Sequence, residues 1–183
     1  LLSYGPHGLV GFEQRDEVLQ EIAERRLENP GDLWAAVRDA QFHEAEGRLD
    51  AALESLDDAV ADENANPELL EQQRRVTLRL LLSLASEHLK TDEEYFARAR
   101  DLASSVDERL AVGRLEADRY LARGDNGSAF GLYWRLGEQH ALDHMMSEGP
   151  LTIRLDQWLA GRMEDIWDSA DEEVLRDIDR RIS

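Results

Sequence analysis

The sequence predicts an all-α protein of about nine helices, arranged as antiparallel hairpins, and three observations support this fold class. Ala, Leu, Glu and Arg, all good helix formers, dominate the 183 residues. Apolar residues recur at the spacing of a helical face, and the alternation that is typical of strands is hard to find. Short turn signals separate the periodic stretches, so we expect consecutive helices to pack antiparallel.

The composition is compatible with one domain that has a real interior. Hydrophobic residues make up 42% of the chain, and charged residues, at 33%, suffice for solvated helix faces. Residues 1–11 contain three glycines and one proline, so we expect an irregular lead-in or linker there. We expect a single helical domain over residues 12–183.

Local signals bound the first three predicted helices. The first begins near Phe12 and ends before Pro30, because the residue that precedes a proline disfavours helical backbone. Asp32 can cap the second helix, and Gly47 breaks it before the third begins. The expected ranges are about 12–28, 33–46 and 49–63.

The next three helices have clear starts. Asn66 can cap a long helix with Pro67 in its first position, and a broad apolar face predicts that this helix is well buried. Thr91 and Glu94 have the spacing of a capping box for the helix that follows. The expected ranges are about 67–89, 92–104 and 107–123.

Turns also separate the last three helices. The sequence GDNGS at 124–128 is a tight-turn signal, and SEGP at 147–150 ends the next helix. Ser169 and Glu172 form a capping-box pattern for the last one. The expected ranges are about 128–146, 151–168 and 170–182.

Small residues repeat at the same spacing in two of the predicted hairpins. Helices that pack closely need such residues where their backbones approach, and a glycine suits the corner between them. In both hairpins an alanine lies seven residues before the glycine and another lies five residues after it. The residues are Ala40, Gly47 and Ala52 in one hairpin and Ala117, Gly124 and Ala129 in the other.

These two units, residues 32–66 and 108–142, resemble the tetratricopeptide repeat, a helix–turn–helix unit of about 34 residues. The matching residues are Ala40, Gly47, Ala52, Leu56 and Ala59 in the first unit and Ala117, Tyr120, Gly124, Ala129 and Tyr133 in the second. The pattern is degenerate, because Asn64 replaces a frequent proline and Leu136 replaces the last small residue. The resemblance implies hairpins stacked as an α-solenoid. The alternative is an ordinary helical bundle in which alanines merely occupy close contacts.

The resemblance also implies a binding surface. In that family the first helix of each hairpin lines a concave groove that takes extended peptides or helices. Carried over to this chain, the lining comprises Trp34, Val37, Gln41, Glu44, Arg114, Asp118 and Leu121. We therefore expect a non-enzymatic scaffold that mediates protein–protein or interdomain interactions through this groove. Among the residues that clamp a peptide carboxylate in the family, only Arg114 has a counterpart here, so we do not expect carboxylate capture in the groove.

A second resemblance suggests an alternative function. The stretches GPHGLVGFEQRDE and GPLTIRLDQWLAGRMEDIW look like segments of large bacterial proteins that join such helices to a PQQ-type β-propeller. This resemblance implies a module of a longer protein. The alternative function is a structural helical domain that supports an attached β-propeller or catalytic module.

The charge narrows the choice of partners. With 40 acidic and 21 basic residues, the formal charge of −19 repels nucleic acids and anionic lipids. Residues 39–68 contain ten acidic residues and one basic residue, so a basic segment is the expected partner if this stretch borders the groove. No apolar run reaches the length of about 18 residues that a membrane span needs, so we expect no membrane insertion. A soluble protein is expected, and cytoplasmic and exported locations both stay open.

Two further groups of residues allow sharper hypotheses. His140 and His144 lie four residues apart on a predicted helix, a spacing found in some zinc sites, but Ala141 occupies the place of the glutamate in HExxH. A metal-dependent enzyme is therefore a remote alternative, and we expect no cofactor. The chain contains no cysteine, which excludes thiolate chemistry. Trp158, Ile166 and Trp167 can share an apolar face, as core or as a docking patch for a neighbouring domain.

Overall fold

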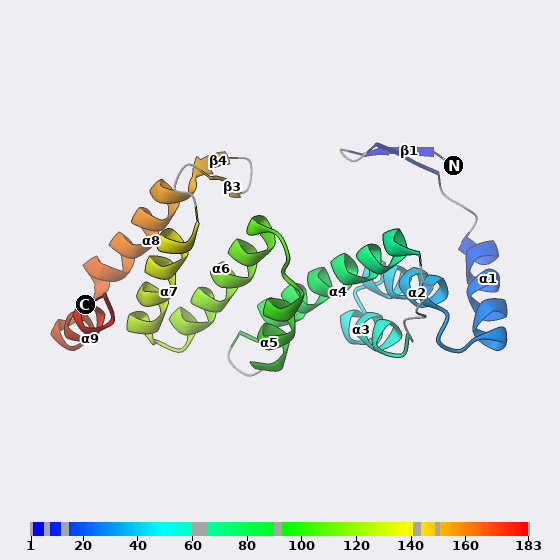
Figure 1. Ribbon diagram of the computed structural model, residues 1–183, viewed down its shortest axis with the longest axis horizontal. Coiled ribbons are helices and arrows are strands. Elements are labelled where there is room, and N and C mark those ends of the chain that lie inside the picture. The colour runs from blue at the N-terminus through cyan, green and yellow to red at the C-terminus, as the bar shows by residue number, and fades with distance from the viewer. Residues whose placement is uncertain are drawn as a thin grey trace. The chain divides into compact units, whose positions relative to one another are not determined.

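A computed structural model describes residues 2–5, 8–11, 15–59, 66–89, 93–140, 144–148 and 151–182. These residues form nine α-helices and two short β-hairpins, which confirms the predicted all-α class (Figure 1). Contacts between residues divide the chain into two compact units, unit 1 (Leu1–Ser83) and unit 2 (Leu84–Ser183). The predicted single domain over 12–183 stays a prediction.

Unit 1 contains a hairpin of strands followed by helices. Its elements are β1 (Leu2–Gly5), β2 (Gly8–Gly11), α1 (Arg15–Glu28), α2 (Leu33–Ala45), α3 (Leu49–Asp57) and α4 (Pro67–Glu87), whose last turn belongs to unit 2. The prediction of irregular backbone is wrong for residues 2–5 and 8–11, because β1 and β2 pair antiparallel with Leu2 opposite Gly11. The role of this segment as a lead-in or linker stays a prediction. The sequence contains a Pro–His pair between two short apolar runs that glycines bound, and such punctuation also suits a hairpin.

Helices α2 and α3 form the centre of unit 1. Asp32 caps α2 as predicted, because its carboxylate accepts a hydrogen bond from the backbone N–H of Ala35 at 2.8 Å. The core between α2, α3 and α4 consists of Leu33, Val37, Ala40, Ala52, Leu56, Val76 and Leu80. A smaller cluster of Val18, Ile22 and Ala35 packs α1 against α2.

The corner between α2 and α3 is a Schellman turn. Gly47 has φ +74°, a left-handed conformation that glycine adopts without steric cost. The N–H of Gly47 donates to the carbonyl of Glu44 at 3.0 Å, and the N–H of Arg48 donates to the carbonyl of His43 at 2.9 Å. These two bonds satisfy carbonyls at the end of α2 that have no partner within the helix.

Unit 2 is helical with one hairpin of strands. Its remaining elements are α5 (Glu93–Leu102), α6 (Val106–Ala122), α7 (Asn126–Gln139), β3 (Met145–Glu148), β4 (Leu151–Arg154), α8 (Leu155–Ser169) and α9 (Glu172–Ile182). Its core consists of Leu110, Ala117, Ala129, Phe130, Tyr133, Leu136, Leu155, Trp158, Leu159, Ile166 and Ile178. Helix α6 begins with a capping box between Ser105 and Glu108.

The corner between α6 and α7 repeats the first corner. Gly124 has φ +76°. Its N–H donates to the carbonyl of Leu121 at 2.9 Å, and the N–H of Asp125 donates to the carbonyl of Tyr120 at 2.9 Å. Both corners therefore close the first helix of a hairpin with the same pair of hydrogen bonds.

The small residues of the repeated pattern are buried, as the pattern predicts. Ala40, Ala52, Ala117 and Ala129 are each 0% exposed. Helix α6 also approaches α7 closely at Gly113, where an added Cβ would lie 2.9 Å from a methyl group of Leu136. Close approach of neighbouring helices thus accounts for the small side chains in both hairpins. The solenoid arrangement stays a prediction.

The described residues between 140 and 154, which are 140, 144–148 and 151–154, depart from the predicted helices. Helix α7 ends at Gln139, and His140 has extended backbone with φ −120° and ψ 153°. Strand β3 pairs antiparallel with β4, with Met145 opposite Arg154. The β-branched residues Thr152 and Ile153 favour the strand, so the predicted helices over 128–146 and 151–168 are wrong at these ends.

The capping residues predicted for two other helices, Ser169 and Thr91, are not confirmed. The carboxylate of Asp171 accepts hydrogen bonds from the N–H groups of Glu173 and Val174, so Asp171 rather than Ser169 begins α9. The hydroxyl of Ser169 donates instead to carbonyls of the preceding helix. The predicted cap at Thr91 lies outside the described residues.

Candidate functional site

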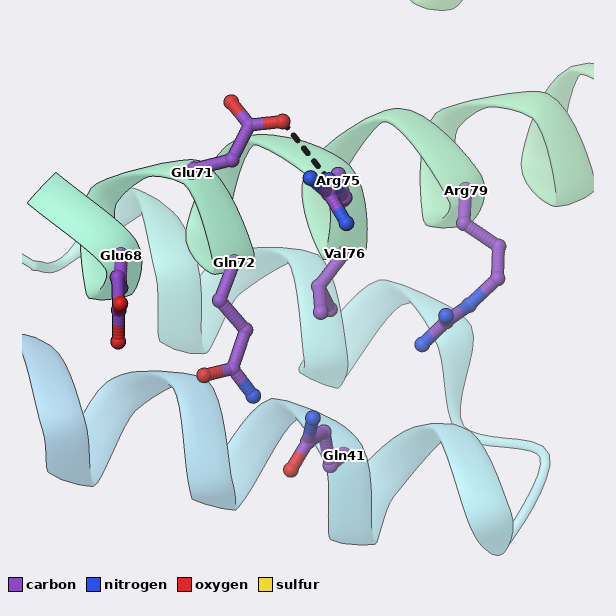
Figure 2. A pocket seen from close by; sticks show the side chains of 7 residues that line it. All are labelled: Gln41, Glu68, Glu71, Gln72, Arg75, Val76 and Arg79. Carbon is purple, nitrogen blue, oxygen red and sulfur yellow. Dashed lines mark hydrogen bonds and ion pairs between the residues drawn. The ribbon is translucent and has the colours of Figure 1, made fainter. Parts of the chain in front are cut away.

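A pocket of about 460 Å³ lies between α2 and α4 in unit 1, and we call it the α2–α4 pocket (Figure 2). Gln41 lines it from α2, and the other lining residues come from α4: Glu68, Glu71, Gln72, Arg75, Val76 and Arg79. The pocket therefore has a polar wall on each of two helices that share a core.

The periodicity of α4 explains this arrangement. Glu68, Gln72, Arg75 and Arg79 follow one another at steps of four, three and four residues, which places them along one side of a helix. Val76, 3% exposed, lies beside this polar stripe and belongs to the core that also contains Val37 of α2. Because the apolar side of α4 packs against the core residues of α2 and α3, the polar stripe of α4 lies next to α2.

Two carboxamides face each other across the pocket. Figure 2 shows the side chains of Gln41 and Gln72 pointing toward one another from opposite helices. The carbonyl oxygen of Gln41 accepts a long hydrogen bond of 3.4 Å from Arg38. Among the residues that the structure describes, none forms a hydrogen bond with the Gln72 side chain. Each carboxamide offers two donors and one acceptor oxygen, so both have capacity for a ligand.

The arginines that lie near the two carboxamides form ion pairs with carboxylates. Arg79 donates two hydrogen bonds of 2.6 Å to the carboxylate of Glu44, and this bidentate pair raises the pKa of the guanidinium. Glu71 accepts from Arg74 at 2.8 Å and from Arg75 at 2.7 Å, and these hydrogen bonds lower its pKa to about 2. The Glu71 carboxylate therefore stays charged at neutral pH, and Glu44 and Glu71 each pair with arginines of α4.

The pocket has no excess of acidic charge. Its lining contains two carboxylates, Glu68 and Glu71, and two guanidiniums, Arg75 and Arg79. Glu68 forms no ion pair with another residue in the described part of the chain. Among the described acidic residues of the surrounding sequence, four lie on or beside the exposed side of α3: Asp50, Glu54, Asp57 and Asp58. Among the described carboxylates that line the pocket, Glu68 is thus the one available to a basic group.

The predicted lining of unit 1 divides into three groups. Gln41 lines the pocket, and Glu44 borders it through its pair with Arg79. Trp34 is half-buried under two guanidiniums, with Arg25 at 4.4 Å and Arg38 at 5.6 Å from the ring centroid. Val37 is 1% exposed and belongs to the core, so a partner cannot contact it and its assignment to the groove is corrected.

The predicted lining of unit 2 packs against its own neighbours. The guanidinium of Arg114 lies 5.6 Å from the ring centroid of Trp158, a core residue of α8. Leu121 is half-buried against the core of unit 2, and Asp118 is also half-buried. A groove that continues through both hairpins stays a prediction.

The two histidines do not lie on one helix face. His140 follows the end of α7, and His144 precedes β3 and contacts Asp107 of α6, with Nε2 and Oδ1 at 2.7 Å. The pKa of His140 is lowered by burial and by the positive charges of Arg109 and His144. Within the described ranges, no three His, Asp or Glu side chains form a group able to hold a metal ion.

The predicted apolar face of α8 is mainly core. Trp158 and Ile166 are each 4% exposed and belong to the core of unit 2. Trp167 is 45% exposed and stacks in a tilted arrangement on Phe130, with 6.3 Å between the ring centroids. Other residues of unit 2 therefore cover Trp158 and Ile166, and Trp167 alone of these three residues is exposed.

Sequence reasoning missed the part of the site that α4 contributes. The polar stripe at Glu68, Gln72, Arg75 and Arg79 is visible in the sequence at helical spacing. The leucines of α4 predict a well-buried helix and carry no information on the polar stripe on its other side.

Comparisons with protein-family models, with curated proteins and with solved structures find no match to this chain. A search of the described helices finds none that is both long and apolar enough to cross a membrane. The candidate site is therefore supported by the arrangement of the residues that line the α2–α4 pocket.

Proposed function

We propose that the chain is a non-enzymatic scaffold, tetratricopeptide-like in its hairpins, that binds an extended peptide segment in the α2–α4 pocket. The segment belongs to a protein partner or to a neighbouring domain of the same chain. Two facing carboxamides, those of Gln41 and Gln72, carry this proposal. They converge from different helices on one pocket, and each has hydrogen-bonding capacity that the chain does not use.

A carboxamide has the same donors and acceptor as a peptide group. Gln41 and Gln72 are therefore suited to pair with the main-chain N–H and C=O groups of a segment that lies between them. Such pairing selects an extended backbone rather than a particular side chain. The ion pairs Glu44–Arg79 and Glu71–Arg75 border the pocket with arginines that already have carboxylate partners.

One basic side chain in the partner would complete the charge pattern. Glu68 is exposed at one end of the polar stripe, so a lysine or arginine that follows the bound backbone would reach it. The other carboxylate of the lining, Glu71, already has two arginine partners. We therefore expect a segment with a single basic residue, and a moderate decrease of affinity with salt.

Selection from a library of random dodecapeptides displayed on phage, with the full chain immobilised, tests this function. We expect selected peptides to contain a basic residue. Gln41→Ala and Gln72→Ala are each expected to weaken binding by about two- to twelve-fold, because each removes a hydrogen bond. Gln157→Ala, an exposed glutamine of α8, is the matched control and should leave affinity unchanged.

Two outcomes would contradict the proposed function. One is a library that yields no peptide above background. The other is a set of peptides whose affinity is unchanged in the folded double variant Gln41→Ala/Gln72→Ala, with folding checked by far-UV circular dichroism. The second outcome would show that peptides bind elsewhere on the chain.

A further inference from the structure

A second pocket, of about 240 Å³, lies between α5, α6 and α7 in unit 2, and we call it the α5–α7 pocket. Its floor is apolar and comprises Ala103, Val112, Gly113, Leu132 and Leu136. Its rim is polar and comprises Arg100, Arg109, Glu116, Gln139 and His140. It shares no residue with the α2–α4 pocket.

The rim carries positive charge in a chain whose formal charge is −19. Arg100 donates to the buried carboxylate of Glu116 at 3.1 Å, so these two charges compensate each other. Arg109 donates to the carbonyl of Ser104 at 2.8 Å and forms no ion pair with any residue of the described ranges. A guanidinium has five N–H donors, so most of those of Arg109 remain for a ligand.

His140 adds a second donor to the same rim. Its ring is half-buried at the end of α7, and burial together with the charges of Arg109 and His144 lowers its pKa. His144 in turn contacts the carboxylate of Asp107. An anion between Arg109 and His140 would offset the charge of Arg109 and favour the protonated imidazole.

We propose that the α5–α7 pocket binds a small carboxylic acid with a branched aliphatic group. Arg109 and His140 hold the carboxylate, and Val112, Leu132 and Leu136 contact the aliphatic part. The volume of about 240 Å³ lies below the range of about 300–1,000 Å³ that drug-sized ligands occupy, and it suits a group of the size of leucine. Charge-assisted hydrogen bonds supply the specificity for carboxylate over a neutral polar group.

Isocaproate, its neutral amide and NMR of the histidine rings test this site in the full chain. Isocaproate is expected to saturate the pocket and to raise the pKa of His140. Binding is expected to be tighter at about pH 5.5 than at about pH 7.5, because the anion favours the protonated imidazole. Isocaproamide is expected to bind at least about ten-fold more weakly.

Two variants separate the site from a general charge effect. Arg109→Ala is expected to weaken isocaproate binding at least about ten-fold, and His140→Ala to remove most of its pH dependence. Arg135→Ala, an exposed arginine of α7 outside the pocket, is the matched control and should bind as the parent chain does. Circular dichroism of each variant shows whether the fold is retained.

Several results would overturn this assignment. They are equal affinity for isocaproate and isocaproamide, unchanged affinity of folded Arg109→Ala, and no saturable binding of isocaproate below about 10 mM. A tetrapeptide that ends in leucine with a free carboxylate tests the other source of the same chemistry. If only that peptide binds, the ligand is a chain terminus and the proposed small acid is wrong.

Discussion

The hairpins α2–α3 and α6–α7 turn at the same geometry and differ at the start of their second helices. Arg48 and Asp125 occupy the equivalent N-cap positions, with φ and ψ of −94° and 68° for Arg48 and of −87° and 70° for Asp125. Asp125 caps α7 by accepting a hydrogen bond from the N–H of Ser128 at 3.0 Å, whereas Arg48 makes no side-chain cap. The shared backbone shows that the glycine corner, and not the cap, determines the turn.

A carboxylate that is buried in one hairpin and half-buried in the other provides a second parallel between them. Asp39 and Glu116 each immediately precede the alanine that packs against the neighbouring helix. Asp39 pairs with Arg26 of α1 at 3.0 Å, and Glu116 pairs with Arg100 of α5 at 3.1 Å. Each unit therefore joins the first helix of its hairpin to the helix before it by an arginine–carboxylate pair.

The largest predicted effect tests whether both hairpins depend on close helix approach. Ala40→Leu and Ala117→Leu each force a larger side chain into a fully buried position. We expect each substitution to lower the free energy of unfolding by about 1–3 kcal/mol, measured by urea denaturation. Hydrogen exchange is expected to show the loss in the hairpin that carries the substitution.

Ala111→Leu is the matched control, because Ala111 is an exposed residue of α6. Its effect should stay within about 0.5 kcal/mol. If Ala40→Leu or Ala117→Leu behaves like this control, that hairpin does not need a small side chain at its contact, and its likeness to the other hairpin is limited to the corner.

A smaller effect is expected at the two glycine corners. Gly47→Ala and Gly124→Ala place a Cβ on left-handed backbone, and an added Cβ meets no atom within 4 Å at either position. The expected loss of about 1–2 kcal/mol therefore comes from the backbone alone and should be nearly equal in both hairpins. Urea denaturation measures both values.

Gly161→Ala tests the reason for that loss. Gly161 lies inside α8, where an added Cβ also meets no atom within 4 Å and the backbone is not left-handed. We expect this substitution to stabilise the chain by about 0.5–1 kcal/mol, because alanine has the higher helix propensity. A loss of stability at Gly161 would show that the alanine side chain, and not the φ angle, destabilises the corners.

The hairpins were predictable because their signals are local. A glycine at a helix end and alanines at fixed distances from it are determined by a few neighbouring residues, so Gly47, Gly124 and the buried alanines could be identified from the sequence. The β3–β4 hairpin could not be identified in this way. Methionine and glutamate at its first strand favour helix, and the pairing with Leu151–Arg154 outweighs that preference.

The candidate site was only half predictable for a similar reason. The family resemblance places Gln41 in a binding groove, but its partner Gln72 depends on which side of α4 packs against α2. That orientation is decided by the core contacts of Val76 and Leu80, which are tertiary. The same limit explains Val37, which the resemblance assigns to the groove and which instead fills the core.

The smallest predicted changes in the free energy of unfolding come from substitutions at the two N-cap residues, Asp125 and Arg48. Asp125→Ala should lower the free energy of unfolding by about 1 kcal/mol, because it removes the acceptor for Ser128. Arg48→Asp should raise it by about 0.5–1 kcal/mol, because the backbone of Arg48 already has the conformation of Asp125. The exposed pair between Arg48 and Glu46 is lost in that variant, but such surface pairs contribute little. If Arg48→Asp fails to stabilise the chain while Asp125→Ala destabilises it, the two corners are not equivalent beyond their glycines, and the second helices of the hairpins begin by different means.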